Sequence, residues 1–490
     1  MRKTKSRKIL PWETKNVILN VITYVINMGV LFALFIGTLY LNSVTDSTID
    51  FSAQIKNATN FLHFFVLLSL IVGLTALYLF FEDRDFLRSA VNSEMLFLII
   101  EISLIVCYVS GSYLNIYVRP LALATLLALF LSDRRKAIFI NIVYCLLTFL
   151  FDSLSGTKLD IGQYPMLIMG FASGMLAVFT MDKVYSRIKL LMMSLLITLP
   201  SVFCILTLVI SNADVNTWET ILFGACSGPF AVSAFIILLP IFETTFTKVS
   251  NFKLAELTDH KSKLIRKLIQ QAPGTFNHAI VVSNIAEACA IAINEDALLA
   301  RTCAYYHDIG KLRRPEFFKE NQADGYNPHD DLTPELSTNI IKSHAQDGYQ
   351  LILKNRLPKI IADVCIEHHG TLPILYFYGK AQKFTDGEVD IAQYCYAGPK
   401  PSTKIAAIIM IADGCEAAAR SLQDRSRENV KKVVRKIVNE RMELGQFDDC
   451  EITLKELNII IHTVVNNLTG IYHSRIEYPK VNLDGIELNN

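Results

Sequence analysis

The 490-residue sequence lacks the features that several common protein classes require. Its ten cysteines are scattered, form no CxxC pair and avoid the predicted external loops, so neither a disulfide framework nor a zinc ribbon is indicated. The net charge of +1 gives no reason to expect a nucleic-acid-binding surface spread over the molecule. No run of alternating apolar and polar residues predicts a sheet in the second half of the chain, so we expect an all-α fold.

Apolar residues are abundant, at 52% of the sequence, which is high for a wholly soluble protein. The first half contains repeated apolar runs that predict about eight membrane spans within residues 17–242. The run at 120–132 is shorter than the roughly 20 residues that a straight span needs, so a boundary error or a re-entrant segment is an alternative there. The predicted spans are 17–41, 60–81, 95–118, 120–132, 137–152, 164–181, 190–210 and 220–242.

The loop charges predict the orientation of these spans. The tail at 1–16 is strongly basic, and Lys and Arg recur in the predicted inner loops, whereas the predicted outer loops hold only Lys56, Arg119 and Lys158. By the positive-inside rule, both termini are then expected in the cytoplasm. The first apolar run is longer than the core of an ordinary signal peptide, so we interpret it as an anchor.

Glu101 falls inside the third predicted span, where an ionisable side chain is costly and suggests a function. The alternative, which we favour, is that Glu101 faces the interior of the bundle and forms a hydrogen bond there. The sequence shows no companion charges that would outline an ion path, which argues against a transporter or a channel.

After Glu243, helical periodicity with capping signals replaces the long apolar runs. We predict a juxtamembrane linker helix at 243–272, a helical domain at 273–480 and a tail at 481–490. The linker carries Lys261, Lys263, Arg266 and Lys267, which are interpreted either as a signalling helix or, preferably, as a solvated basic face near anionic lipid. Within the domain, Thr333 before Pro334 predicts a helix start, and Thr453 with Glu456 predicts a capping box.

Histidines are concentrated in one window of this domain. Six of the ten lie between positions 278 and 369, and two adjacent pairs fall at predicted helix C-termini. A lone histidine is usually a structural residue, which is how we interpret His260, His462 and His473, but six in one window indicate a site. The six are His278, His307, His329, His344, His368 and His369.

Histidines combined with a carboxylate suit iron, manganese or zinc. The two oxygens of Asp308, next to His307, could bridge two ions while histidines complete each shell. Two ions about 3.5–4 Å apart can activate water and stabilise both oxygens of a phosphodiester displacement. For His329, in the loop Asn327-Pro328-His329-Asp330, substrate contact and a structural role are equally favoured.

An ordered set of motifs resembles the seven-transmembrane HD family of cyclic di-AMP phosphodiesterases, which are bacterial inner-membrane enzymes. The resemblance covers about 253–480 and implies a binuclear iron or manganese site built from His278, His307, Asp308, His344, His368, His369 and Asp413. It also implies hydrolysis of cyclic di-AMP to the linear dinucleotide, with Asp308 catalytic. Lys311, one turn past the His307-Asp308 pair, is a further catalytic candidate that could neutralise phosphate charge, and Arg314 is a weaker one. The alternative for both is a solvated loop charge, and Lys311, Arg314 and His329 are the candidates for substrate contact. The motifs are Ala272–Thr275, Tyr305–Lys311, Asn327–Asp330, Glu367–Thr371, Gly398–Pro401, Ala412-Asp413, Gly470–His473 and Arg475–Pro479.

Two other functions are possible for an HD domain, and the chain differs from the family in one large respect. HD relatives that act on cyclic di-GMP carry a Gly-Tyr-Pro sequence after the histidine pair, where this chain has Tyr376-Phe377-Tyr378-Gly379. A nucleotide receptor without catalysis would have lost ligands that are present here. Family members usually carry a sizeable extracellular domain after the first span, and here only Ser43 to Thr59 stands in its place. We therefore expect cyclic di-AMP and a lipid bilayer as partners and no nucleic acid polymer, with a homodimer left open.

Overall fold

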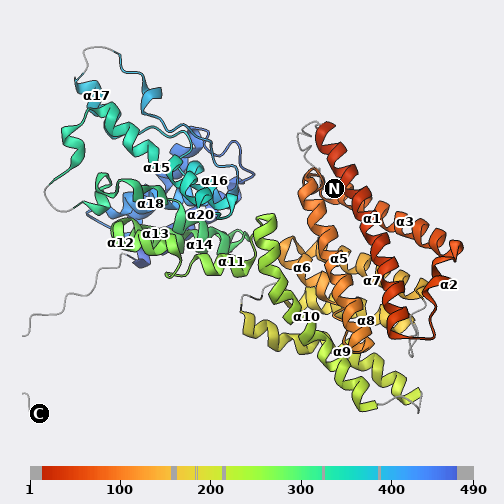
Figure 1. Ribbon diagram of the computed structural model, residues 1–490. Helices are drawn as coiled ribbons and strands as arrows, with labels where there is room; N and C mark the ends of the chain where they lie inside the picture. The colour runs from red at the N-terminus through yellow and green to blue at the C-terminus, as the bar shows by residue number, and fades with distance from the viewer. Residues whose placement is uncertain are drawn as a thin grey trace, which may run out of the picture. The chain divides into compact units, whose positions relative to one another are not determined.

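The computed structural model describes residues 14–155, 163–181, 184, 186–211, 217–322, 326–384 and 388–471. The chain forms two compact units, Met1–Phe252 and Lys253–Asn490. Regular structure in the described residues is helical throughout, with a single isolated bridge between Pro373 and Cys395, as the all-α prediction requires (Figure 1). The predicted basic tail up to residue 13, the loop residue Lys158 and the terminal motif from 472 onward lie outside the described residues.

The first unit is a bundle of long apolar helices, joined by short turns. Among its described residues, seven helices are long and apolar enough to cross a membrane. Its helical elements are α1 (Thr14–Thr45), α2 (Phe51–Ile55), α3 (Ala58–Glu82), α4 (Arg84–Leu87), α5 (Ala90–Tyr113), η1 (Ile116–Val118), α6 (Leu123–Leu131), α7 (Arg134–Leu154), α8 (Gln163–Met181), α9 (Arg187–Ser211) and α10 (Thr217–Phe246).

The span expected at 120–132 differs from the other seven. It contains α6, which has only nine residues, all of them buried. A helix of that length covers about 14 Å, roughly half of the hydrocarbon core of a bilayer. This length agrees with the boundary error or re-entrant segment that the sequence left open at 120–132, and surrounding helices bury the segment.

The segment around α6 nevertheless carries the chain across the bundle. Lys136 at the start of α7 pairs with Asp83 after α3 at 2.7 Å, so the start of α7 lies at the end of the bundle where α3 stops and α5 begins. Helix α5 leaves that end, and its 24 residues span about 36 Å. The chain between α5 and α7 must then return towards that end of the bundle.

Both ends of the bundle unit lie on one side. Asn20 and Asn27 of α1 hydrogen-bond Ser93 and Glu94 near the start of α5. After α10, Lys248 lies over the Phe86 ring, 5.6 Å from its centroid, at this same end. The start of α1 and the exit from α10 therefore face the same side of the bundle.

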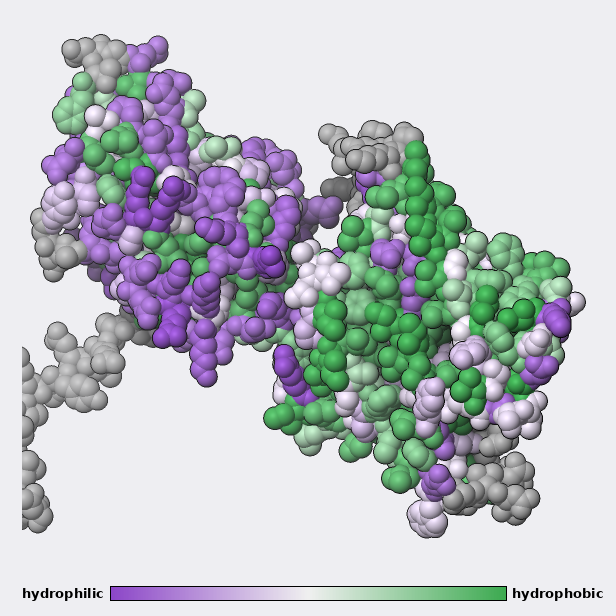
Figure 2. All heavy atoms as spheres, viewed as in Figure 1, coloured by the Kyte–Doolittle hydropathy of each residue, from purple (hydrophilic) through white to green (hydrophobic). Residues whose placement is uncertain are grey.

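Lipid-facing and interior residues separate as expected for a membrane bundle. The visible surface of this unit is largely hydrophobic in Figure 2, whereas the second unit is largely hydrophilic. Glu101 is buried as predicted, but its Oε1 atom has no hydrogen-bond partner among the described residues. Arg119 was expected in an outer loop and is instead buried, 3.0 Å from the buried Asp152. A count of loop charges cannot detect such a pair, because the two residues are 33 positions apart in the chain.

The second unit is a helical domain around one hydrophobic core, to which buried residues from Leu257 to Leu468 contribute. Its long helices are α13 (Pro273–Ala292), α14 (Ala297–Tyr306), α15 (Pro334–Lys354), α16 (Lys359–Glu367), α17 (Leu375–Phe384), α18 (Lys404–Arg420), α19 (Arg427–Glu443) and α20 (Leu454–Ile471). Short 3₁₀ turns connect them: η2 (Ile309–Arg313), η3 (Pro315–Phe317), η4 (Lys319–Asn321), η5 (Pro328–Asp331) and η6 (Ile391–Tyr394). The predicted capping box is present, since Thr453 and Glu456 exchange hydrogen bonds before α20.

The linker predicted as one helix at 243–272 is instead divided. Helix α10 runs on to Phe246, and two short helices follow, α11 (Asn251–Leu257) and α12 (Lys263–Gln271). Helix α12 buries Leu264, Ile265 and Leu268 in the core of the second unit, so this unit begins near residue 253, about 20 residues before the predicted boundary. The basic residues of α12 are exposed, as expected for a solvated face.

Candidate metal centre

The His307-Asp308 pair follows the last residue of α14, where the helix gives way to the 3₁₀ turn η2. This turn packs directly against α15. A Cβ atom at Gly310 would collide with the backbone of His344 and Gly348, so only glycine permits this approach. The close packing brings Asp308 beside His344, whose Nε2 atom lies 3.3 Å from Oδ1 of Asp308.

The second pair, His368-His369, follows α16 in the same way. Gly370 ends the helix with φ of +51°, a left-handed conformation that favours glycine. Glu367 accepts hydrogen bonds from the backbone and hydroxyl of Ser402, at 3.0 and 2.7 Å, which ties the start of the α18 segment to the histidine pair. The pair is thereby fixed between α16 and α18.

The structure brings all seven predicted metal ligands together in two adjoining groups. Besides the two pairs, α13 contributes His278, α15 contributes His344 and α18 contributes Asp413. One group consists of Asp308, His344, His368 and His369, and the other consists of His278, His307 and Asp413. Sequence spacing alone did not predict Asp413, which the family resemblance supplied.

The two oxygens of Asp308 face different groups. Oδ1 lies 3.3 Å from Nε2 of His344 and 3.7 Å from Nε2 of His368. Oδ2 lies 3.3 Å from Nε2 of His307 and 3.8 Å from Nε2 of His278. This geometry is what a carboxylate needs in order to bridge two ions.

Donor atoms at this centre are oriented inward. Nδ1 of His307 lies 2.7 Å from the carbonyl of Ala304, and Nδ1 of His344 lies 2.5 Å from that of Ile341. Because a carbonyl only accepts, these contacts place the proton on Nδ1 and leave the Nε2 lone pair for an ion. Nε2 of His307 and Oδ1 of Asp308 are buried without a hydrogen-bond partner among the described residues. Buried polar atoms without partners are costly, and a divalent cation fits them.

Charges in the centre shift its pKa values. Burial alone would raise the pKa of the Asp308 carboxyl, but Lys311 and His307 hold it well below its usual range. Burial lowers the pKa values of His368 and His369, the latter strongly. His278 differs: burial opposes protonation, yet Asp413 and Glu416 raise its pKa to about 9. The carboxylates are ionised at neutral pH and His368 and His369 are neutral, which are the forms that bind metal.

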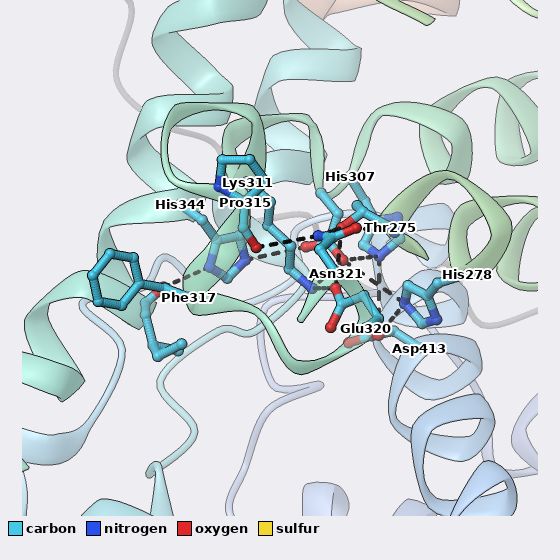
Figure 3. Close-up of polar contacts among 12 residues, drawn as sticks. Thr275, His278, His307, Lys311, Pro315, Phe317, Glu320, Asn321, His344 and Asp413 are labelled. Carbon is cyan, nitrogen blue, oxygen red and sulfur yellow. Dashed lines mark hydrogen bonds and ion pairs between the residues drawn. The ribbon is translucent and has the colours of Figure 1, made fainter. Parts of the chain in front are cut away.

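Lys311 lies at the edge of the centre with its side chain largely buried, so the alternative of a solvated loop charge is wrong. Its ammonium group lies 2.7 Å from Asp308 and 2.8 Å from Glu320, and Figure 3 shows Lys311 and Glu320 with the surrounding ligands. Thr275 donates a hydrogen bond to Glu320 at 3.1 Å and so joins this cluster. Arg314, in contrast, is exposed and makes no ion pair among the described residues, so the structure does not bring it into the centre.

His329 packs as a structural residue beside the centre. It is buried, its Nε2 lies 2.9 Å from the carbonyl of Phe317, and its ring lies against Phe317 and Phe377. These contacts favour the structural role over substrate contact. His260 and His462 are exposed, in agreement with their structural interpretation, and His473 lies outside the described residues.

Three residues of the centre were missed by reasoning from the sequence. Glu320 pairs with Lys311, Glu416 contacts His278, and Tyr396 stacks on His369 with ring centroids 4.3 Å apart. Glu416 follows Asp413 by three positions on one helix, a spacing that places both on the same face. Only that spacing was a usable signal, because Glu320 reaches the centre on the short η4 turn and Tyr396 on an irregular loop.

Comparison with known proteins defines the class. Residues 58–250 match the family model described as a 7TM receptor with intracellular HD hydrolase, and residues 275–418 match the HD domain model. The chain belongs to the family of seven-transmembrane proteins that carry an intracellular HD hydrolase domain. Six of the long apolar helices and the short α6 segment lie within 58–250.

Among named relatives, the chain is similar to two cyclic-di-AMP phosphodiesterases called PgpH. It is 37% identical to the Bacillus subtilis protein over 430 residues, which is 84% of this chain, and 38% identical to the Listeria monocytogenes protein over 369 residues, which is 74% of this chain. It covers only 60% and 50% of their respective lengths. The crystal structure of the L. monocytogenes PgpH HD domain is 45% identical, with a TM-score of 0.42 over 44% of this chain and all of that domain.

Proposed function

We propose that this protein is a membrane-bound, metal-dependent phosphodiesterase that hydrolyses cyclic di-AMP to the linear dinucleotide. The observation that carries the proposal is the position of Asp308, with one oxygen facing each of two ligand groups. The resemblance in sequence to two cyclic-di-AMP phosphodiesterases supports the choice of substrate.

The proposed ligands are His344, His368 and His369 for one ion and His278, His307 and Asp413 for the other, with Asp308 shared. Two divalent ions, iron or manganese, suit this mixture of imidazole and carboxylate donors and would supply activated water and positive charge to the phosphodiester. His368, His369 and the ionised carboxylates described above need no change of protonation to accept them, whereas His278, with its pKa raised to about 9, would lose a proton on binding an ion.

The chain's own residues complete the proposed chemistry. Lys311 holds its ammonium group beside the shared carboxylate, in position to offset negative charge on the phosphate in the transition state. Glu320 fixes Lys311 from the opposite side and is itself held by Thr275. His329 and Arg314 are not needed for these steps: His329 packs in the protein, and Arg314 points to solvent.

The proposed location is the bacterial cytoplasmic membrane, with both ends of the chain in the cytoplasm. The start of α1 and the exit from α10 share one side of the bundle, and charged residues Glu82, Asp83, Arg135 and Lys136 gather on that side. With an even number of passes, the basic N-terminal sequence would place that side inside. Cyclic di-AMP in the cytoplasm would then have access to the HD domain.

The test is turnover by the purified full-length protein in lipid, loaded with manganese or iron. The expected product is the linear dinucleotide, with kcat/KM higher for cyclic di-AMP than for cyclic di-GMP. A preference for cyclic di-GMP would contradict the proposed substrate. It would leave the proposed metal-dependent hydrolysis standing. Nucleotide binding without any turnover by metal-loaded protein would instead support the receptor alternative.

A further inference from the structure

We propose that Glu416 and Arg420 form a positioning pair that fixes the orientation and tautomer of His278, and thereby sets the affinity of the ion position formed by His278, His307 and Asp413. The inference rests on the metal centre of the proposed function. It assigns to these two residues a role in metal affinity rather than a role in the fold alone.

His278 lies between two carboxylates of the same helix. Its Nε2 atom is 3.0 Å from Oδ1 of Asp413, and its Nδ1 atom is 2.6 Å from Oε2 of Glu416. Asp413 and Glu416 are three residues apart on α18 and therefore share a face of that helix. One side of the imidazole thus faces the ligand group while the other is held by Glu416.

This arrangement distinguishes His278 from three other histidines of the centre. Nδ1 of His307, His344 and His368 lies near a backbone carbonyl of the residue's own helix or helix end. His278 instead faces a buried carboxylate that is 138 positions away in the chain. A carboxylate behind a metal-binding histidine fixes the ring and raises its basicity, and losing such a partner typically lowers metal affinity about 10–100-fold.

Arg420 holds Glu416 in this position. Its Nη2 atom lies 2.7 and 2.6 Å from the two carboxylate oxygens, and its Nε atom lies 3.0 Å from Oε1. The same Nη2 atom is 3.0 Å from Nδ1 of His278. A guanidinium only donates, so a bond from Arg420 to the ring would require the proton on Nε2 and would prevent that atom from binding an ion.

The contacts favour the productive tautomer. The 2.6 Å contact between Nδ1 and the carboxylate is shorter than the contact with Arg420, and a charge-assisted hydrogen bond of this kind is the stronger one. Nδ1 therefore donates to Glu416, and Nε2, which faces Asp413 and the ion position, is the atom that would bind an ion after losing its proton. Arg420 balances the negative charge of Glu416, which is buried.

The experiment measures the binding of Mn²⁺ alone to the full-length protein in lipid nanodiscs. A chelator first removes any bound metal from the protein. Free Mn²⁺ is followed by electron paramagnetic resonance, which gives the number of ions bound and the Kd of each. Three variants are compared with wild type: Glu416→Leu removes the acceptor, Glu416→Gln keeps an acceptor without the charge, and Arg420→Leu removes the group that holds it. The control is Glu428→Gln, which breaks a similar pair with Lys432 on the exposed face of α19.

The expected result is weaker binding of one of the two ions, by about 10–100-fold in Glu416→Leu and by less in Glu416→Gln and Arg420→Leu. The second ion and the Glu428→Gln variant should match wild type. Isotherms of the folded variants that coincide with wild type would overturn the inference. If Glu416→Leu does not fold, unchanged affinity in both Glu416→Gln and Arg420→Leu would overturn it equally. Wild-type protein that binds no Mn²⁺ would overturn the proposed function itself, which is a separate outcome.

Discussion

Lys311 holds its ammonium nitrogen 2.7 Å from Oδ2 of Asp308, three residues earlier in the chain. This oxygen is also the one that faces His307, so the lysine lies at the edge of the centre rather than in solvent. Burial would lower the pKa of Lys311, but Asp308 and Glu320 raise it above its ordinary value and keep the side chain charged. A fixed positive charge is therefore available beside the shared carboxylate.

Replacing Lys311 should lower the rate of hydrolysis without changing the amount of bound metal. Lys311→Met is expected to lower kcat by about 100-fold, the scale of losing one electrostatic donor, with metal content unchanged. Turnover and metal analysis of the same preparation test this. Lys359→Met is the control, because Lys359 is exposed and pairs with Asp363 in a local i,i+4 contact. A parallel loss of metal would show that Lys311 positions Asp308 instead of acting on the substrate.

Removal of the shared carboxylate should abolish both functions of the centre. Asp308→Ala is expected to lower turnover by at least about 100-fold and to reduce the metal content, because both ion positions lose a ligand. Metal content is measured by elemental analysis of the purified protein. Asp330→Ala, at a largely exposed carboxylate near the centre, should retain both. Full metal content with near-normal turnover in Asp308→Ala would contradict the proposed bridge.

The boundary of the second unit can be tested by truncation. A fragment that begins at Lys253 is expected to fold, whereas one that begins at Pro273 should not, because it lacks the buried Leu264, Ile265 and Leu268 of α12. Each such side chain contributes about 1.5–3 kcal/mol, so the loss approaches the whole stability of a typical domain. Thermal unfolding followed by circular dichroism compares the two. Equal midpoints would show that α12 is a linker, as the sequence suggested.

Acid should destabilise the metal-free protein through two histidines. Burial lowers the pKa values of His368 and His369, whereas in the unfolded chain they titrate near 6.5. Their contribution is complete above about pH 6.5 and is lost as the pH falls, by up to about 1.4 kcal/mol per pH unit for each histidine. His278 has the opposite sign: its pKa is raised to about 9, so its contribution is already complete below pH 6.5.

The measurement is the unfolding midpoint of chelator-treated protein at pH 7, 6 and 5. His368→Asn should flatten this dependence, while His462→Asn, at an exposed position on α20, should not. A midpoint that stays constant from pH 7 to pH 5 in the wild-type protein would contradict the assignment.

The sequence by itself determined the membrane character, the helical domain and the ligand types of the centre. Long apolar runs can only be accommodated as buried or lipid-facing helices, and capping residues such as Thr453 mark helix ends through local hydrogen bonds. The clustered histidines were visible because they lie within one window, and the family resemblance added Asp413. These are properties of short stretches of chain.

Tertiary structure alone decided the remaining features, since each depends on residues far apart in the chain. The sequence did not show that Arg119 is buried against Asp152 or that α12 belongs to the domain core. The pairing of Glu416 with His278 and of Glu320 with Lys311 also emerges only when α13, α18 and the η4 turn pack together. Burial and ion pairing depend on three-dimensional proximity, and neither composition nor periodicity records which distant segments meet.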